Sequence, residues 1–172
     1  MLGDLTEKIQ SSQNKLEELI NKIPGYSGYR AKEQRRDADK ILRMYVAEQY
    51  DQVLDRLNRV QYDLVSAGDL TGMMLLERAV SRLQLLVDRI RTASYGYAGL
   101  FDAIKVDDNA LDRLYDFDHS MLDGVATLSD TLDQIAAVIA EGQSVQELGA
   151  ALMAELEALH RSFSERQQVI LS

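Results

Sequence analysis

Residues 71–94 read TGMMLLERAVSRLQLLVDRIRTAS, and this stretch decides the fold class. Apolar side chains recur in it at alternating steps of three and four residues, a spacing that places them along one edge of an α-helix as a heptad-type seam. The seam consists of Met73, Leu76, Val80, Leu83, Val87 and Ile90. Because a helix with one apolar edge must pack that edge against other elements, the stretch predicts a helical bundle.

The segment before this stretch predicts its first packing partner. Residues 30–67 contain neither glycine nor proline, and apolar residues follow one face until Gly68, a suitable residue to end a helix. A helix of that length would extend about 57 Å at 1.5 Å per residue, which favours an elongated bundle. Since Gly68 and Asp69 leave a very short connection, helices 30–67 and 71–94 are predicted to form an antiparallel hairpin.

Three further segments continue the helical pattern. Helix 109–141 ends at Gly142, and the pair Ser144 and Glu147 has the spacing of a capping box that begins helix 145–170. An amphipathic helix is also predicted at 5–22. The sequence therefore predicts one all-α domain over residues 1–172, an elongated up-down-up-down four-helix bundle with an additional N-terminal helix.

Composition excludes several classes of function. The chain has 172 residues and no cysteine, which rules out disulfides, thiolate catalysis and cysteine-ligated metals. Residues 106–159 hold twelve of the 28 acidic residues but only one of the 19 basic residues, and the net charge is −9. Such a surface repels phosphate, so no nucleic-acid partner is expected. No apolar run approaches the roughly 18 residues of a membrane span, and no secretory signal begins the chain, so a cytoplasmic location is expected.

The two histidines suggest a candidate metal site. Glu157 and His160 have the E-x-x-H spacing that places a carboxylate and an imidazole one turn apart, as in ferritin-like metal-binding bundles. Counting helical rise places His119 at a similar height on the neighbouring helix, close to Asp116. The four residues could form a small metal site, and the alternative interpretation is two surface histidines among acidic side chains. No other cofactor is expected.

Helix 109–141 also raises the question of which side chain fills the layer between Leu114 and Met121. Asp118 falls on the apolar register there, but a buried carboxylate would need a partner. Phe117 is therefore predicted to fill the layer, with Asp118 turned outward.

A second candidate surface combines tyrosines and arginines. Tyr26, Tyr29 and the basic stretch from Arg30 to Arg43, with Arg35 and Arg36, could bind an anionic group or pair with acidic helices. Tyr95 and Tyr97 follow a glycine-rich break after residue 94 and are predicted to lie at the same end of the bundle as Tyr26 and Tyr29.

The element Ile23-Pro24-Gly25-Tyr26-Ser27-Gly28-Tyr29 resembles a pattern in uncharacterised bacterial all-helical proteins, as does Tyr95-Gly96-Tyr97-Ala98-Gly99. This resemblance implies that the two glycine–tyrosine elements form a defined feature, and it implies no activity. The chain also resembles, more loosely, the long helical hairpins of phage-shock and ESCRT-like membrane remodellers.

Three functions are compatible with these patterns. The first is a non-enzymatic interaction or scaffold protein that binds a protein partner or itself, because the basic stretch 30–43 complements the acidic stretch 106–159. The second is a ferritin-like metal-binding bundle. The third is a protein that binds membrane surfaces through helix 5–22 and the basic stretch.

Overall fold

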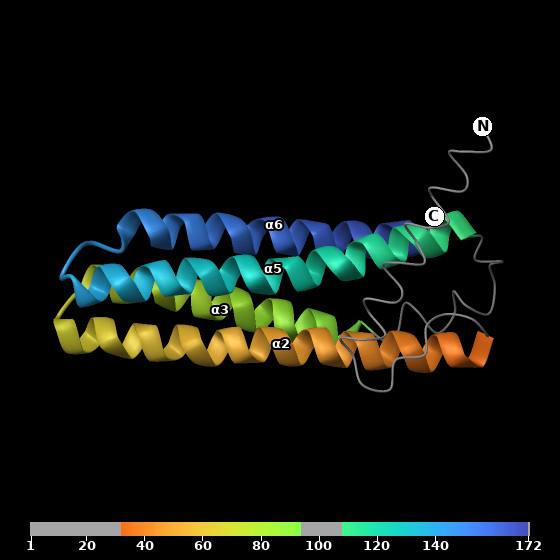
Figure 1. Cartoon of the computed structure of the whole chain (residues 1–172), viewed down its shortest axis with the longest axis horizontal. Helices are drawn as coiled ribbons and strands as arrows, with labels where there is room; N and C mark the ends of the chain where they lie inside the picture. The colour runs from red at the N-terminus through yellow and green to blue at the C-terminus, as the bar shows by residue number, and fades with distance from the viewer. Residues whose placement is uncertain (1–31, 94–107, 172) are drawn as a thin grey trace.

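The computed structural model describes the backbone of residues 32–93 and 108–171, and the side chains of residues 41–93, 116–166 and 168. The helices in these ranges lie lengthwise against one another (Figure 1), and the same ranges contain no strand. They are α2 (Lys32–Ala67), α3 (Leu70–Thr92), α5 (Asp108–Ala140) and α6 (Gln146–Leu171). The predicted all-helical bundle is confirmed, and helix 5–22 lies outside the described residues.

Both hairpin turns depend on a glycine with positive φ. Gly68 (φ +77°) follows α2 and Gly142 (φ +69°) follows α5, a left-handed conformation that glycine adopts without a Cβ clash. At each turn the amides that follow the helix donate to its last carbonyls; Asp69 N–H, for example, donates to the Leu64 carbonyl at 3.1 Å. The Asp69 carboxylate then accepts from Gly72 N–H at 2.8 Å and begins α3. The predicted antiparallel hairpin of α2 and α3 is therefore confirmed.

The order of the helices around the bundle is α2, α3, α6, α5, because contacts join each of these to the next and α5 to α2. The two hairpins consequently lie side by side with their turns at the same end (Figure 1). As a result α2 runs parallel to its neighbour α5, and α3 runs parallel to its neighbour α6. The sequence predicted the alternating directions but not this order, which places α3 and α5 at opposite corners.

The core is a continuous column of aliphatic side chains contributed by all four helices. Each helix contributes at least one leucine that is at most 1% exposed, for example Leu57, Leu83, Leu128 and Leu156. Burial of a leucine side chain of this kind stabilises the fold by about 1.5–3 kcal/mol. The seam predicted for α3 is buried at Leu76, Leu83, Val87 and Ile90 and half-buried at Met73 and Val80.

A tyrosine and a glycine hold α2 and α5 close together. The Tyr50 hydroxyl is buried and donates to the Met121 carbonyl of α5 at 2.6 Å. A Cβ at Gly124 would lie 2.7 Å from that hydroxyl oxygen, so only glycine leaves room for the ring. Burial raises the pKa of the Tyr50 hydroxyl, which therefore stays a hydrogen-bond donor.

Candidate functional site

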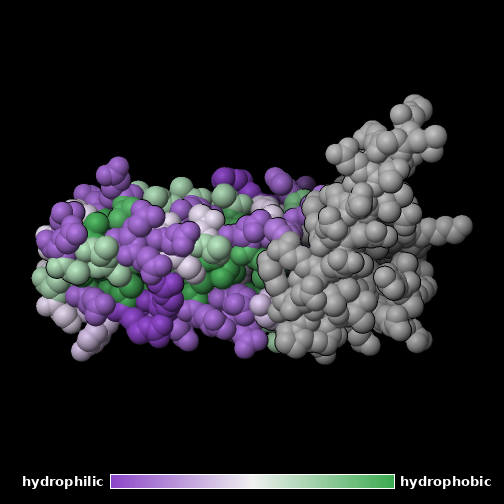
Figure 2. All heavy atoms as spheres, in the orientation of Figure 1, coloured by the Kyte–Doolittle hydropathy of each residue, from purple (hydrophilic) through white to green (hydrophobic). Residues whose placement is uncertain are grey.

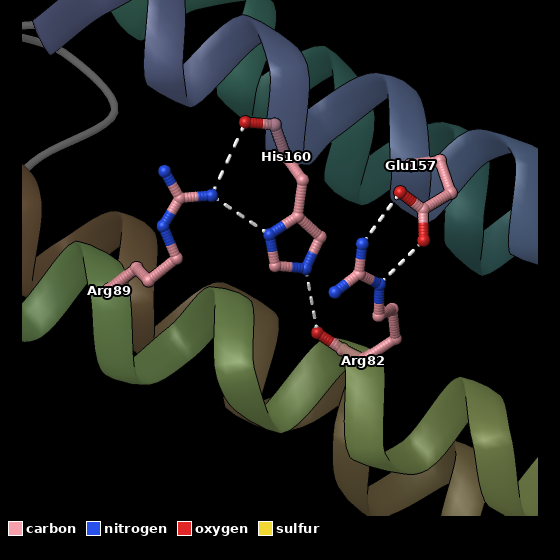
Figure 3. A network of polar contacts seen from close by, with 4 residues as sticks. All are labelled: Arg82, Arg89, Glu157 and His160. Carbon is pink, nitrogen blue, oxygen red and sulfur yellow. Dashed lines mark hydrogen bonds and ion pairs between the residues drawn. The ribbon is translucent and has the colours of Figure 1, made fainter.

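A network of polar contacts joins α3 to α6 (Figure 3). Arg82 of α3 donates from Nε and Nη2 to the two carboxylate oxygens of Glu157 on α6, at 2.5 and 2.7 Å. This paired hydrogen bond holds the pKa of the Glu157 carboxyl below its usual range. About two turns further along α3 and one turn further along α6, Arg89 approaches His160.

His160 uses both ring nitrogens in this network. Nε2–H donates to the Arg82 carbonyl at 2.9 Å, and Nδ1 accepts from Arg89 Nη1 at 3.0 Å, so the ring is neutral (Figure 3). Arg89 also donates to the Ser164 hydroxyl at 2.8 Å and lies over the Phe163 ring, 5.2 Å from its centre. Burial lowers the pKa of His160, and the charges of Arg82 and Arg89 lower it further, while the Arg82 carbonyl and Glu157 oppose the shift.

The contacts of His160 predict how the stability of the fold changes as the pH falls. Because the pKa of His160 in the folded protein lies below its value of 6.5 in the unfolded chain, the folded state binds fewer protons. The stability that the fold gains from neutral His160 is fully present above pH 6.5, and it is lost as the pH falls through the folded-state pKa of His160. We expect His160→Gln to flatten the decline in the free energy of unfolding between about pH 7 and 5, measured by urea denaturation. Identical slopes in wild type and His160→Gln would contradict the assignment.

A groove runs between α3 and α6 from the hairpin turns toward this network. Its volume is about 1150 Å³. Its lining mixes apolar or small side chains with charged and polar ones; the lining residues include Met74, Leu75, Ala150, Met153, Glu77, Arg78, Ser81 and Gln146. Methionine side chains are flexible and polarisable, so walls of this kind adapt to an apolar partner.

Large apolar side chains are exposed along the same side of α3. Leu70 is 65% exposed, Met74 63% and Leu85 45%. These positions are separated by 4 and 11 residues, so they lie on one face of the helix, opposite the buried seam. The face over α2, α5 and α6 shows hydrophilic and hydrophobic patches interspersed in its described part (Figure 2), and Met44, Tyr62 and Val65 of α2 are also exposed. The exposed apolar face of α3 and the groove beside it form the candidate functional site.

The structure does not bring the predicted metal ligands together. Glu157 binds Arg82, and His160 binds Arg82 and Arg89, whereas His119 lies 3.0 Å from Asp123 on its own helix. Asp116 is exposed. No group of three or more metal-binding side chains occurs in the described ranges, which include all four candidates. The geometry therefore does not support the predicted site, because Arg82 and Arg89 of α3 are the partners of Glu157 and His160.

The prediction for Phe117 and Asp118 is wrong. Asp118 is buried at 4% exposure and Phe117 is half-buried. Arg166 of α6, itself 2% exposed, supplies the partner: its Nε and Nη2 lie 2.9 and 2.8 Å from the same Asp118 oxygen. A buried carboxylate is therefore tolerated on the apolar register because a buried guanidinium neutralises it.

Most of the predicted tyrosine and arginine surface lies outside the described residues, namely Tyr26, Tyr29, Arg30, Tyr95 and Tyr97. Arg35 and Arg36 lie in α2, and their side chains are outside the description. From the basic stretch, Arg43 is buried and donates to the carbonyls of Ile90 and Arg91 at 3.4 and 3.2 Å. This base therefore caps the C-terminal end of α3, where a positive charge is favourable.

Sequence reasoning missed the exposed face of α3, although a signal was present. Leu70, Met74 and Leu85 lie off the heptad seam and form a second apolar line on the same helix. A helix that packs only through its seam would carry polar residues there.

Among the helices in the described part of the chain, none has the length and apolar content needed to cross a membrane. Comparisons with protein-family models, curated proteins and solved structures find no match to this chain.

Proposed function

We propose that this chain is a non-enzymatic helical interaction protein that binds a protein partner through α3 and the groove between α3 and α6. The observation that carries the proposal is the exposure of Leu70, Met74 and Leu85 on one helical face beside a groove of about 1150 Å³. Exposed apolar side chains that gather on one face typically mark a binding surface, and a groove lined by both apolar and polar side chains suits an amphipathic helix.

The polar groups of the site support a binding role over a catalytic one. His160 is the side chain best suited to acid–base chemistry on this face, but both its nitrogens are engaged by α3. Arg82 and Glu157 satisfy each other in the same way. These contacts fix α3 against α6 and so keep the groove in one shape.

Site-specific crosslinking tests the proposal. A photoreactive amino acid is placed at Met74, in the groove wall, and in a matched control at Asp130, which is exposed on α5. The variants are produced in the cells that make the protein natively and are irradiated there. We expect a discrete protein adduct from position 74 and little from position 130. Absence of an adduct at position 74, or equal labelling from both positions, would contradict a binding surface on α3.

A further inference from the structure

The polar network leaves one positive charge between α3 and α6 without a counter-charge. Arg89 donates from Nη1 to Nδ1 and the carbonyl of His160, at 3.0 and 3.3 Å (Figure 3), and from Nη2 to the Ser164 hydroxyl at 2.8 Å. All three acceptors are neutral, and Arg89 forms no ion pair with a carboxylate in the described ranges. Since Arg89 is half-buried, part of the water that would solvate its charge is excluded, and the site favours an anion.

An open hollow of about 600 Å³ lies beside Arg89 and continues the groove, with which it shares Arg82 and Glu157. Arg161 of α6 also lines it, is exposed, and forms no ion pair in the described part of the chain. Glu165 is the remaining charged residue of the lining. Because Arg82 and Glu157 neutralise each other, the hollow has one positive charge in excess, on a chain of net charge −9.

The donors in the hollow suit a phosphate group. Among the described residues, no side-chain hydrogen bond uses Arg161 or the Nε–H of Arg89, so both can donate to a ligand. A phosphate monoester has about two negative charges near pH 7 and three acceptor oxygens, so it can meet both guanidiniums at once. A carboxylate has one charge and two oxygens, and it would leave one guanidinium without a counter-charge.

We infer that this hollow is a binding site for a phosphate group, which Arg89 and Arg161 hold between α3 and α6. Both bases lie outside the acidic stretch 106–159. The one acid of that stretch in the lining, Glu157, is already paired with Arg82. The site does not require the protein partner proposed for α3, so the two can be tested independently.

His160 provides an internal reporter of the bound group, because its ring lies between Arg89 and Arg82 (Figure 3). Burial and the charges of both arginines hold the pKa of His160 below its usual range, while the Arg82 carbonyl and Glu157 oppose the shift. Arg161 follows His160 directly in α6 and faces the same hollow. A bound dianion offsets the charges of the arginines, so it should raise the pKa of His160.

Nuclear magnetic resonance of the arginine Nε–Hε groups in the full chain tests the inference. The probe is inorganic phosphate at about pH 7.5, with sodium chloride at equal ionic strength as the reference. We expect the signals of Arg89 and Arg161 to shift together and to saturate, whereas Arg59, which is exposed on α2, should not shift. Sulfate, which stays a dianion as the pH changes, should raise the pKa of His160 measured from its ring signals.

Three variants at exposed positions complete the design. Arg161→Gln should weaken phosphate binding about threefold, and Glu165→Gln, which removes the unpaired acid of the lining, should strengthen it about twofold. Arg59→Gln is the matched control and should bind as wild type does. Absence of saturable shifts at Arg89 and Arg161, or equal affinity in wild type and Arg161→Gln, would overturn the inference.

A second probe distinguishes two sources of the phosphate group. Tighter binding of N-acetyl-O-phosphoserine amide than of inorganic phosphate would assign the site to a phosphorylated polypeptide, and equal or weaker binding would assign it to free phosphate. The proposed function is judged separately, because a crosslink from Met74 would uphold it whether or not the hollow binds phosphate.

Discussion

Replacing Asp118 with alanine is expected to lower the free energy of unfolding by about 3–5 kcal/mol. Asp118 and Arg166 are 4% and 2% exposed, and the pair joins α5 to α6. Removal of the carboxylate leaves the guanidinium buried without the counter-charge that offsets its desolvation. Urea denaturation followed by circular dichroism measures the change, and a loss below about 1 kcal/mol would contradict a buried pair.

Two comparisons separate the effect of burial from that of charge. Asp123→Ala removes an exposed carboxylate that pairs with His119 on the same helix, and its effect should stay within about 1 kcal/mol. The double variant Asp118→Leu with Arg166→Met replaces both charges with apolar groups. Because no buried charge then remains, this variant should be about as stable as wild type, or more stable. A double variant as unstable as Asp118→Ala would show that the attraction between Asp118 and Arg166 exceeds the cost of removing both charges from water.

Replacing Leu83 with alanine is expected to destabilise the bundle by about 2–5 kcal/mol. Leu83 is 1% exposed, in the middle of the seam on α3, so truncation removes core contacts and leaves a cavity. The same denaturation measurement applies. A change below about 1 kcal/mol would mean that Leu83 is not in the core.

Leu85→Ala is the matched control, since it makes the same chemical change two residues further along α3. Leu85 is 45% exposed, so its truncation should change the free energy of unfolding by no more than about 0.5 kcal/mol.

The fold was predictable because its determinants are local. The heptad seam of α3, the glycines that follow α2 and α5, and the absence of proline from these helices specify helices and tight turns without knowledge of long-range contacts. The order α2, α3, α6, α5 was not predictable in this way. It depends on which faces meet, and on contacts such as Tyr50 with Met121, which join positions 71 residues apart.

The candidate site was harder to predict, because charged side chains on the neighbouring helix determine which contacts its residues make. Glu157 and His160 have the spacing of metal ligands in sequence, but Arg82 and Arg89 of α3 occupy them in space. Asp118 shows the same limit, since Arg166 lies 48 residues away in sequence. A sequence pattern reports what a side chain could bind, and the bundle order determines which partner reaches it.

Crosslinking along α3 tests the central claim, a protein-binding surface on that helix, most directly. A photoreactive amino acid at Leu70, Met74 or Leu85, which are exposed on one face of α3, should capture the same protein partner, whereas the same amino acid at Asp130 on α5 should capture little. No adduct from any of the three α3 positions, or equal labelling from position 130, would contradict the account.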